Sequence, residues 1–190
     1  MQTLVELCCR TLAANYWRID GLQGVPDFLG RRISWLILHQ EGFFTQKSLS
    51  IYIKLFSESF GADFLRSFRF SSLLPDPLWI TGLVSSCSLT TLCLDDCRLG
   101  LELLHLLPSL GFALRTLHFL SLRHNYLTNT AIRSLTAYSR YHGHTDGLKI
   151  LDVSLNPFLD EKAVDLLCSM PSLILVYMSD TGASVSLISM

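Results

Sequence analysis

The chain has 190 residues, of which 49% are hydrophobic and 16% charged, and its formal net charge is −1. This composition excludes a disordered chain and allows one domain with a substantial core, alone or with a small appendage. The net charge gives no electrostatic basis for binding nucleic acid or an anionic membrane, and no apolar run approaches the roughly 18 residues that cross a bilayer.

The six cysteines form no CxxC pair, so reduced thiols in the cytosol or nucleus are expected instead of a secreted disulfide framework. The amino-terminal segment has Glu6 before any basic residue and no cleavage-like site, which predicts a retained segment and not a signal peptide. Cys87, Cys93 and Cys97 could be metal ligands, but zinc sites usually have paired short spacings, so buried thiols are favoured.

Residues 1–60 contain no repeat and are predicted to be helical. Apolar residues four apart predict a first helix, and Gly21 and Gly24 then interrupt the chain. A second helix is expected from Val25, with Pro26 in its first turn, where a missing N–H costs little. The segment TQKSLSIYIKLF predicts a third helix. The apolar residues that define these faces are Leu4, Cys8 and Leu12, then Val25, Leu29 and Ile33, then Leu49, Ile53 and Phe56.

From residue 61 onward one pattern recurs at intervals of 24 to 31 residues. Its copies are LTTLCLDDCRL from Leu89, LHFLSLRHNYL from Leu117 and LKILDVSLNPF from Leu148, with a weaker LILVYMSDT from Leu173 and a degenerate LRSFRFSSL from Leu65. Each copy begins with strand-like alternation and then turns at a small polar residue. A buried amide at that turn can bond backbone groups that have left the strand. Helical spacing follows in NTAIRSLTAYSRY and DEKAVDLLCSM.

This LxxLxLxxN/CxL pattern resembles the leucine-rich repeat family over residues 61–182. Segments such as RIDGLQGVPDFL and LKILDVSLNPFLDEKAVDLLCSMPSL resemble, nearly end to end, one group of longer, non-enzymatic members. The resemblance implies an α/β solenoid with a concave parallel sheet and convex helices. A helical amino-terminal cap would occupy 1–60 and an apolar carboxyl-terminal tail 183–190, with an unpaired sheet edge at the tail. Neighbouring copies must share one interior, in which Leu94, Leu122 and Val153 meet.

The outward strand positions on the concave face are the candidate partner-binding residues. Phe119, Ile150 and Leu175 would form an apolar row on a face open to water, which often marks a binding site. A terminal segment folding over the row, or a register shifted by one residue, are the alternatives. Asp95 and Arg123 are predicted to form a cross-strand ion pair. The candidate set is Asp95, Phe119, Arg123, Ile150, Asp152, Leu175 and Tyr177, and the expected function is a non-catalytic protein-interaction scaffold or adaptor whose partner is unknown.

Within residues 3–33, the first two predicted helices are also similar to the von Hippel–Lindau type box. Leucine-rich repeat receptors of cullin ubiquitin ligases use that box to hold elongin C and a cullin. The resemblance implies an alternative role as a substrate receptor. This role needs the box residues to be exposed, whereas a cap would bury them. Its residues are Leu4, Cys8 and Leu12 for elongin C, and Val25, Pro26 and Leu29 for the cullin.

No residue set predicts an enzyme, a cofactor site or a metal site. His142 and His144 could bind a metal, but their Gly-rich polar context predicts a loop. The segment GLQG lacks the spacing of a phosphate-binding loop. The acidic residues Asp95, Asp96, Asp152 and Asp160 are scattered over different copies and predict no acid/base pair.

Overall fold

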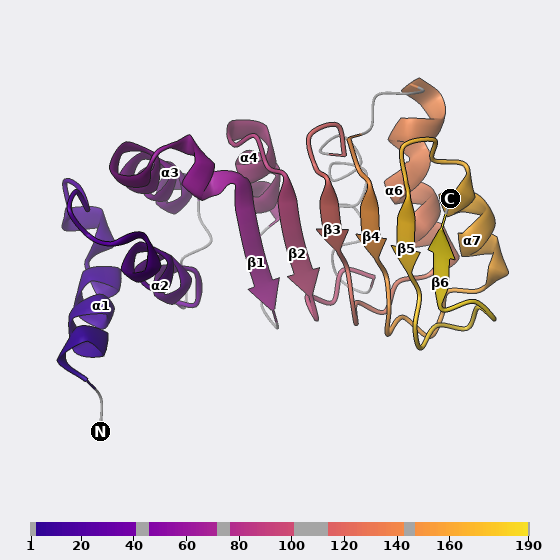
Figure 1. Cartoon of the computed structure of the whole chain (residues 1–190), viewed down its shortest axis with the longest axis horizontal. Helices are drawn as coiled ribbons and strands as arrows, with labels where there is room; N and C mark the ends of the chain where they lie inside the picture. Colours follow the sequence, from indigo (N-terminus) through magenta and orange to yellow (C-terminus); the bar gives the residue numbers. More distant parts are fainter. Residues whose placement is uncertain (1–2, 41–45, 72–76, 101–113, 143–146, 190) are drawn as a thin grey trace.

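The computed structural model describes residues 3–40, 46–71, 77–100, 114–142 and 147–189. Within these ranges the chain is a mixed α/β protein, helical in its first part and alternating between strands and helices in its second (Figure 1). The two parts share one cluster of buried apolar side chains.

The first part contains helices α1 (Leu4–Ala14), α2 (Asp27–Leu38) and α3 (Gln46–Phe60), with short 3-10 helices η1 (Tyr16–Arg18) and η2 (Ala62–Arg66). All three predicted helices are present. The side chain of Thr3 caps α1 by accepting a hydrogen bond from the Glu6 amide at 3.2 Å. The position predicted for Pro26 was wrong by one residue, because α2 begins at Asp27 and the proline is its N-cap.

Aromatic rings hold the helical part against the sheet. Tyr52 and Phe56 on α3 are buried, with ring centroids 4.7 Å apart, and Phe64 of η2 stacks on Phe56 at 5.1 Å. Phe68 of the first strand lies 6.0 Å from Tyr52. This chain of rings links α3 to the start of the sheet, since aromatic pairs at such spacings add to the stability gained by burial.

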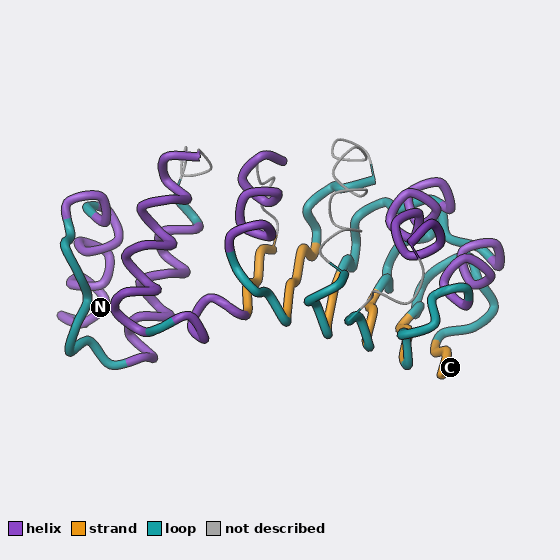
Figure 2. Tube along the Cα trace, turned by 90° about the horizontal axis from the view of Figure 1, so that it is seen from above, coloured by secondary structure: helices purple, strands orange, loops and turns teal. Residues whose placement is uncertain are grey.

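The sheet contains β1 (Ser67–Ser71), β2 (Thr91–Asp95), β3 (Phe119–Ser121), β4 (Ile150–Asp152), β5 (Leu175–Tyr177) and β6 (Leu187–Ser189), side by side in chain order. Strands β1 to β5 are parallel. Helices α4 (Pro77–Ser86), α6 (Asn129–His142) and α7 (Glu161–Cys168) lie on one side of the strands (Figure 2). This alternation is compatible with a leucine-rich-repeat-like fold.

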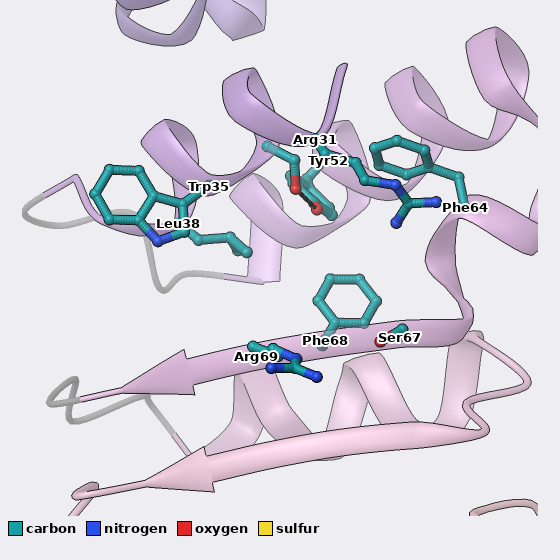
Figure 3. A pocket seen from close by; sticks show the side chains of 9 residues that line it. Arg31, Trp35, Leu38, Tyr52, Phe64, Ser67, Phe68 and Arg69 are labelled. Carbon is teal, nitrogen blue, oxygen red and sulfur yellow. Dashed lines mark hydrogen bonds between the residues drawn. The ribbon is translucent and has the colours of Figure 1, made fainter. Parts of the chain in front are cut away.

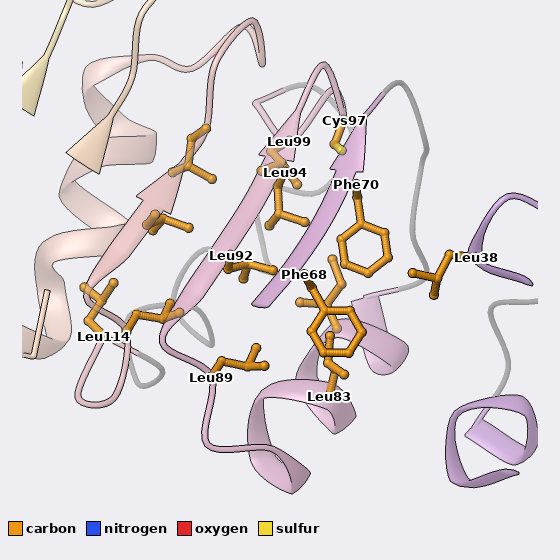
Figure 4. Close-up of a cluster of buried hydrophobic side chains, with 14 of the residues drawn as sticks. Leu38, Phe68, Phe70, Leu83, Leu89, Leu92, Leu94, Cys97, Leu99 and Leu114 are labelled. Carbon is orange, nitrogen blue, oxygen red and sulfur yellow. The ribbon is translucent and has the colours of Figure 1, made fainter. Parts of the chain in front are cut away.

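Neighbouring copies of the repeat share a continuous apolar interior, as predicted. Leu94, Leu122 and Val153 are fully buried and belong to the same cluster. Figure 4 shows part of this interior, with Leu92 and Leu94 of β2 beside Phe68 and Phe70 of β1. Inward side chains from adjacent strands therefore pack on one another, which supplies the burial that one copy alone lacks.

Two buried asparagines connect successive copies through the backbone. Asn125 Oδ1 accepts hydrogen bonds from the amides of Cys97 at 2.8 Å and Leu99 at 3.3 Å, and its Nδ2 donates to the Leu94 carbonyl at 2.6 Å. One copy later, Asn156 Oδ1 accepts from the amides of Asn125 at 2.9 Å and Leu127 at 3.0 Å. Each amide thus satisfies backbone groups of the preceding copy, which extends the prediction made for a buried amide at this turn.

The turns after β2, β3, β4 and β5 use a left-handed backbone at the position before Cys97, Asn125, Asn156 and Thr181. Asp96, His124, Leu155 and Asp180 have φ between 52° and 58°. A non-glycine residue in this region costs roughly 1–2 kcal/mol, and most of all for a branched side chain such as Leu155. The asparagine bonds on the following residue fix the turn and offset this cost.

The prediction of an unpaired sheet edge at the carboxyl-terminal tail was wrong, because the tail pairs with β5. The chain reverses direction after Met178, and β6 then pairs antiparallel with β5, with Val176 opposite Ile188. The Met178 amide also donates to the Ser186 carbonyl at 2.8 Å. Ile188 packs against the core while Leu187 and Ser189 are exposed, which suits a strand, and a reversal of few residues can only produce antiparallel pairing.

Candidate functional site

Leu120, Leu151 and Val176 are buried in the core, and side chains alternate along a strand, so the predicted apolar row lies on the other face of the sheet. Phe119, Ile150 and Leu175 are direct partners across β3, β4 and β5, so the predicted register is correct. All three side chains are half-buried. The tail does not fold over them, because β6 extends the sheet beside β5. Binding of a partner by this row stays a prediction.

Polar side chains beside the row are arranged differently from the prediction. The guanidinium of Arg123 pairs with Asp152, Nη1 to Oδ2, at 3.8 Å, and not with Asp95. Asp95 Oδ1 instead accepts hydrogen bonds from the Ser121 hydroxyl and the Arg123 backbone amide. The predicted Asp95–Arg123 ion pair was therefore wrong, because the side chain of Arg123 extends towards the next strand. Tyr177, in register with Asp152, is 39% exposed.

The cysteines considered as metal ligands do not form a metal site within the described residues, where no group of three ligand-type side chains occurs. Cys93 and Cys97 are buried, and Cys87 is half-buried. Burial raises the pKa of the Cys87 thiol to about 11 and also raises the pKa of Cys93, so both favour the protonated form that binds metals poorly. The predicted loop was wrong for His142, because this residue is the last of α6. Its side chain and the whole of His144 lie outside the described residues.

The six residues of the box-like segment converge on one apolar groove between α1 and α2. The groove has a volume of about 340 Å³. Leu4 is 76% exposed and Cys8 is also exposed, so this face of α1 is open to solvent. The groove is lined by Leu4, Val5, Cys8, Cys9, Leu12, Gly24, Val25, Pro26, Leu29 and Ile33. Val5, Cys9 and Gly24 were not predicted, and Ile33 continues the four-residue spacing of Val25 and Leu29.

Charged side chains near this groove connect α1 and α2 through hydrogen-bonded ion pairs. Glu6 of α1 accepts hydrogen bonds from Arg32 of α2, at 2.8 and 3.1 Å, and from Arg10 at 3.0 Å. Arg32 and Arg10 hold the pKa of the Glu6 carboxyl below its ordinary value. This three-residue cluster holds α1 against α2 and leaves the apolar groove open.

A second pocket, named the arginine pocket here, was not predicted from the sequence. It has a volume of about 280 Å³ and lies between α2 and β1 (Figure 3). No local pattern signals it, because its residues come from segments up to 38 positions apart. They are Arg31, Ser34, Trp35, Leu38, Tyr52, Phe64, Ser67, Phe68 and Arg69.

Among the described residues, no helix has the length and apolar character needed to cross a membrane. No protein-family model matches the chain. Two curated proteins do: leucine-rich repeat-containing protein 42 of Xenopus tropicalis, 30% identical over 187 residues, and the protein of the same name from Xenopus laevis, 28% identical over 184 residues. Each match covers 95% of this chain, whereas the chain spans 44% of the length of each relative. Over nearly all of its length, the chain is similar to leucine-rich repeat-containing protein 42.

Proposed function

We propose that the chain is a non-catalytic protein-interaction module, a leucine-rich repeat scaffold or adaptor that binds another protein with the open face of its sheet. The observation that carries this proposal is the in-register row of Phe119, Ile150 and Leu175 on the face opposite the helices. The names of the relatives, which describe repeat proteins, support the same class. No catalytic set is assigned to the chain.

The row has the chemistry of an interface centre. Its three large apolar side chains are contiguous, and the Arg123–Asp152 ion pair and the half-exposed ring of Tyr177 lie beside them. Apolar and aromatic anchors with a polar rim are typical of protein interfaces. A partner that covers the row removes apolar area from water, which contributes roughly 25 cal/mol per Å².

The structural frame of this proposal is a solenoid of stacked repeats over residues 61–182, with residues 1–60 as a helical amino-terminal cap and 183–190 as a tail. The continuous interior and the asparagine bonds between copies support the stacking. The packing of α3 against η2 and β1 through aromatic rings supports the cap. The six free cysteines fit a reducing compartment, the cytosol or nucleus.

The test is quantitative affinity purification with the full chain and two matched double variants. F119A/I150A removes the centre of the row, and F158A/I174A removes one phenylalanine and one isoleucine that are exposed elsewhere. We expect partner proteins to be lost from the first variant and retained by the second, with both melting temperatures within a few degrees of the parent. Equal capture by both variants would refute the proposal, and a large fall in the melting temperature of F119A/I150A would assign these residues to the core.

A second candidate function, a substrate receptor that binds elongin C and a cullin, is favoured by one observation. All six residues of the box-like segment line the groove between α1 and α2, and the groove face of α1 is exposed. The names of the relatives contain nothing on ubiquitin ligation. The groove is therefore the support for this alternative.

Co-precipitation of elongin C tests this alternative. Leu4→Asp and Cys8→Asp place a charge in the groove, and Phe28→Asp places one at a residue that is 69% exposed and outside the groove. We expect elongin C with the parent chain and with F28D, and at least about tenfold less with L4D and C8D. Absence of elongin C from the parent chain would end this alternative.

A further inference from the structure

The arginine pocket lies at the edge of the sheet. The strand order places β1 at one end, with β2 on one side and no strand of the described residues on the other. The pocket is lined by Ser67, Phe68 and Arg69 of β1 and faces α2 across that edge (Figure 3). An edge strand presents unpaired backbone groups, which are a template for an added extended segment.

Two guanidinium groups contribute to the pocket, and none of the described residues that line it is acidic. The Arg31 Nε donates to Asp27 Oδ2 at 2.8 Å, and its Cζ lies 4.9 Å from the centre of the Phe64 ring. The terminal nitrogens of Arg31 have no hydrogen-bond partner among the described residues, and the exposed Arg69 has neither a hydrogen bond nor an ion pair there. Two positive charges thus line one space, and one of them, Arg31, is paired with Asp27, which is not among the lining residues.

The other side chains that line the pocket are mainly aromatic, and two buried residues add hydroxyl groups. The hydroxyl oxygens of Ser34 and Tyr52 lie 2.5 Å apart, and both residues are buried. Burial raises the pKa of Tyr52, so its phenol stays neutral and adds no negative charge. The ring of Trp35 is 45% exposed and stacks on His39 with centroids 4.0 Å apart. Phe64 and Phe68 also line the pocket and are buried.

Size and charge select the occupant. A volume of about 280 Å³ is at the lower end of pockets that bind small molecules, and it suits one side chain of a longer segment. Guanidinium groups pair strongly with carboxylates, and the pairing is strengthened where apolar walls exclude water. Two guanidinium groups that line one pocket favour an acidic group over a polar or basic one.

We propose that the arginine pocket binds an acidic side chain of an extended peptide segment in a protein partner, with the carboxylate between Arg31 and Arg69 and the segment along the edge of β1. The proposal rests on the proposed function as a protein-interaction module and adds a second recognition surface to it. The partner's residues beside the acidic one are apolar or aromatic and contact Trp35, which is exposed.

Selection from a displayed library of random nonapeptides tests the proposal, using the full chain as bait. The enriched peptides are then synthesised, and their affinities are measured by fluorescence polarisation for the parent chain and two double variants. R31Q/R69Q removes both pocket charges. R10Q/R133Q makes the same change in net charge at exposed arginines on α1 and α6, and R10Q, like R31Q, breaks an exposed i,i+4 ion pair.

The expected result is enrichment of peptides with Asp or Glu beside an apolar residue. These peptides should bind R31Q/R69Q at least about tenfold more weakly than the parent, bind R10Q/R133Q nearly as the parent does, and lose affinity when the acid is exchanged for its amide. A library that yields no acidic peptides, or acidic peptides that bind R31Q/R69Q as tightly as the parent, would overturn the proposal.

The same peptides distinguish this proposal from the function of the open sheet face. F119A/I150A should bind them unchanged, because Phe119 and Ile150 do not line the pocket. If F119A/I150A keeps every partner protein but the peptides still require Arg31 and Arg69, the open-face proposal fails and the pocket stands. If the peptides bind R31Q/R69Q as tightly as the parent while F119A/I150A loses its partners, the pocket proposal fails and the open-face proposal is kept.

Discussion

Two groups of large apolar side chains differ in exposure: the inward side chains of the strands and the outer side chains of the first 35 residues. In the repeat part, inward leucines such as Leu92, Leu120 and Leu151 are fully buried. In the first 35 residues, large apolar side chains face solvent, and Leu4 and Phe28 are 76% and 69% exposed. The other exposed ones in this segment are Val5, Leu7, Trp17 and Trp35.

This difference indicates where stability and binding are located. The periodic part uses its apolar residues, turn asparagines and backbone bonds to hold copies together. The helical part keeps an apolar groove and a charged pocket at its surface, and exposed apolar patches of this kind mark interaction sites. Substitutions of the inward leucines and turn asparagines should therefore cost stability, whereas substitutions in the groove, the arginine pocket and the open-face row should cost binding.

The largest expected effect follows from substituting Asn125 with alanine. The change removes the acceptor for the Cys97 and Leu99 amides and the donor to the Leu94 carbonyl, and it leaves buried backbone groups without partners. We expect the free energy of unfolding, measured by urea denaturation, to fall by about 3–5 kcal/mol. Thr181→Ala, at the equivalent place in a peripheral copy, should cost about 1 kcal/mol. Equal losses in both variants would contradict the structural role given to the buried amide.

A second pair of variants compares equal chemistry in the two regions. Leu122→Ala empties part of the shared interior and should cost about 2–5 kcal/mol of unfolding free energy. Leu4→Ala removes the same atoms from an exposed site, and a change within about 0.5 kcal/mol is expected. If L4A proved as destabilising as L122A in the same urea titration, the groove would be part of the core and unsuited to binding.

The smallest effect concerns the Glu6 cluster that ties α1 to α2. Arg32 and Arg10 lower the pKa of the Glu6 carboxyl in the folded state. The stability that this carboxylate contributes is therefore fully present above the ordinary carboxyl pKa of about 4.3, and it is lost as the pH falls through the lowered pKa. Glu6→Gln should be less stable than the parent at pH 7, and the difference should shrink at pH 3. Asp27→Asn, in an exposed pair with Arg31, is the control and should cost less stability than Glu6→Gln at pH 7. A Glu6→Gln difference that grows towards pH 3 would contradict this account.

Periodicity predicts the parts of the fold in which local pattern and contact coincide. The spacing of Leu94, Leu122 and Val153 predicts their shared burial, and the same spacing places Phe119, Ile150 and Leu175 in register. Each such residue contacts the residue at the equivalent position of the next copy. The pattern of one copy therefore identifies the contacts at that position in the other copies.

Features that depend on long-range geometry were not predictable in this way. The orientation of the Arg123 side chain towards Asp152, the pairing of β6 with β5 and the arginine pocket each depend on how segments distant in the sequence meet. Arg31 and Arg69 belong to a helix and a strand with another helix between them, and no repeat relates them. The groove falls between these cases, since helical spacing identifies six of its residues, while their convergence depends on the packing of α1 on α2.

The measurement that tests the central claim most directly is backbone amide hydrogen exchange, followed by nuclear magnetic resonance in the parent chain and in Asn156→Ala. If copies lie side by side and are joined by their turn asparagines, the amides of Asn125 and Leu127 exchange slowly in the parent. In N156A these two amides, about 30 positions away in the sequence, should lose more protection than those of Cys97 and Leu99, which bond to Asn125. Unchanged protection at Asn125 and Leu127, or rapid exchange at both in the parent chain, would contradict the account.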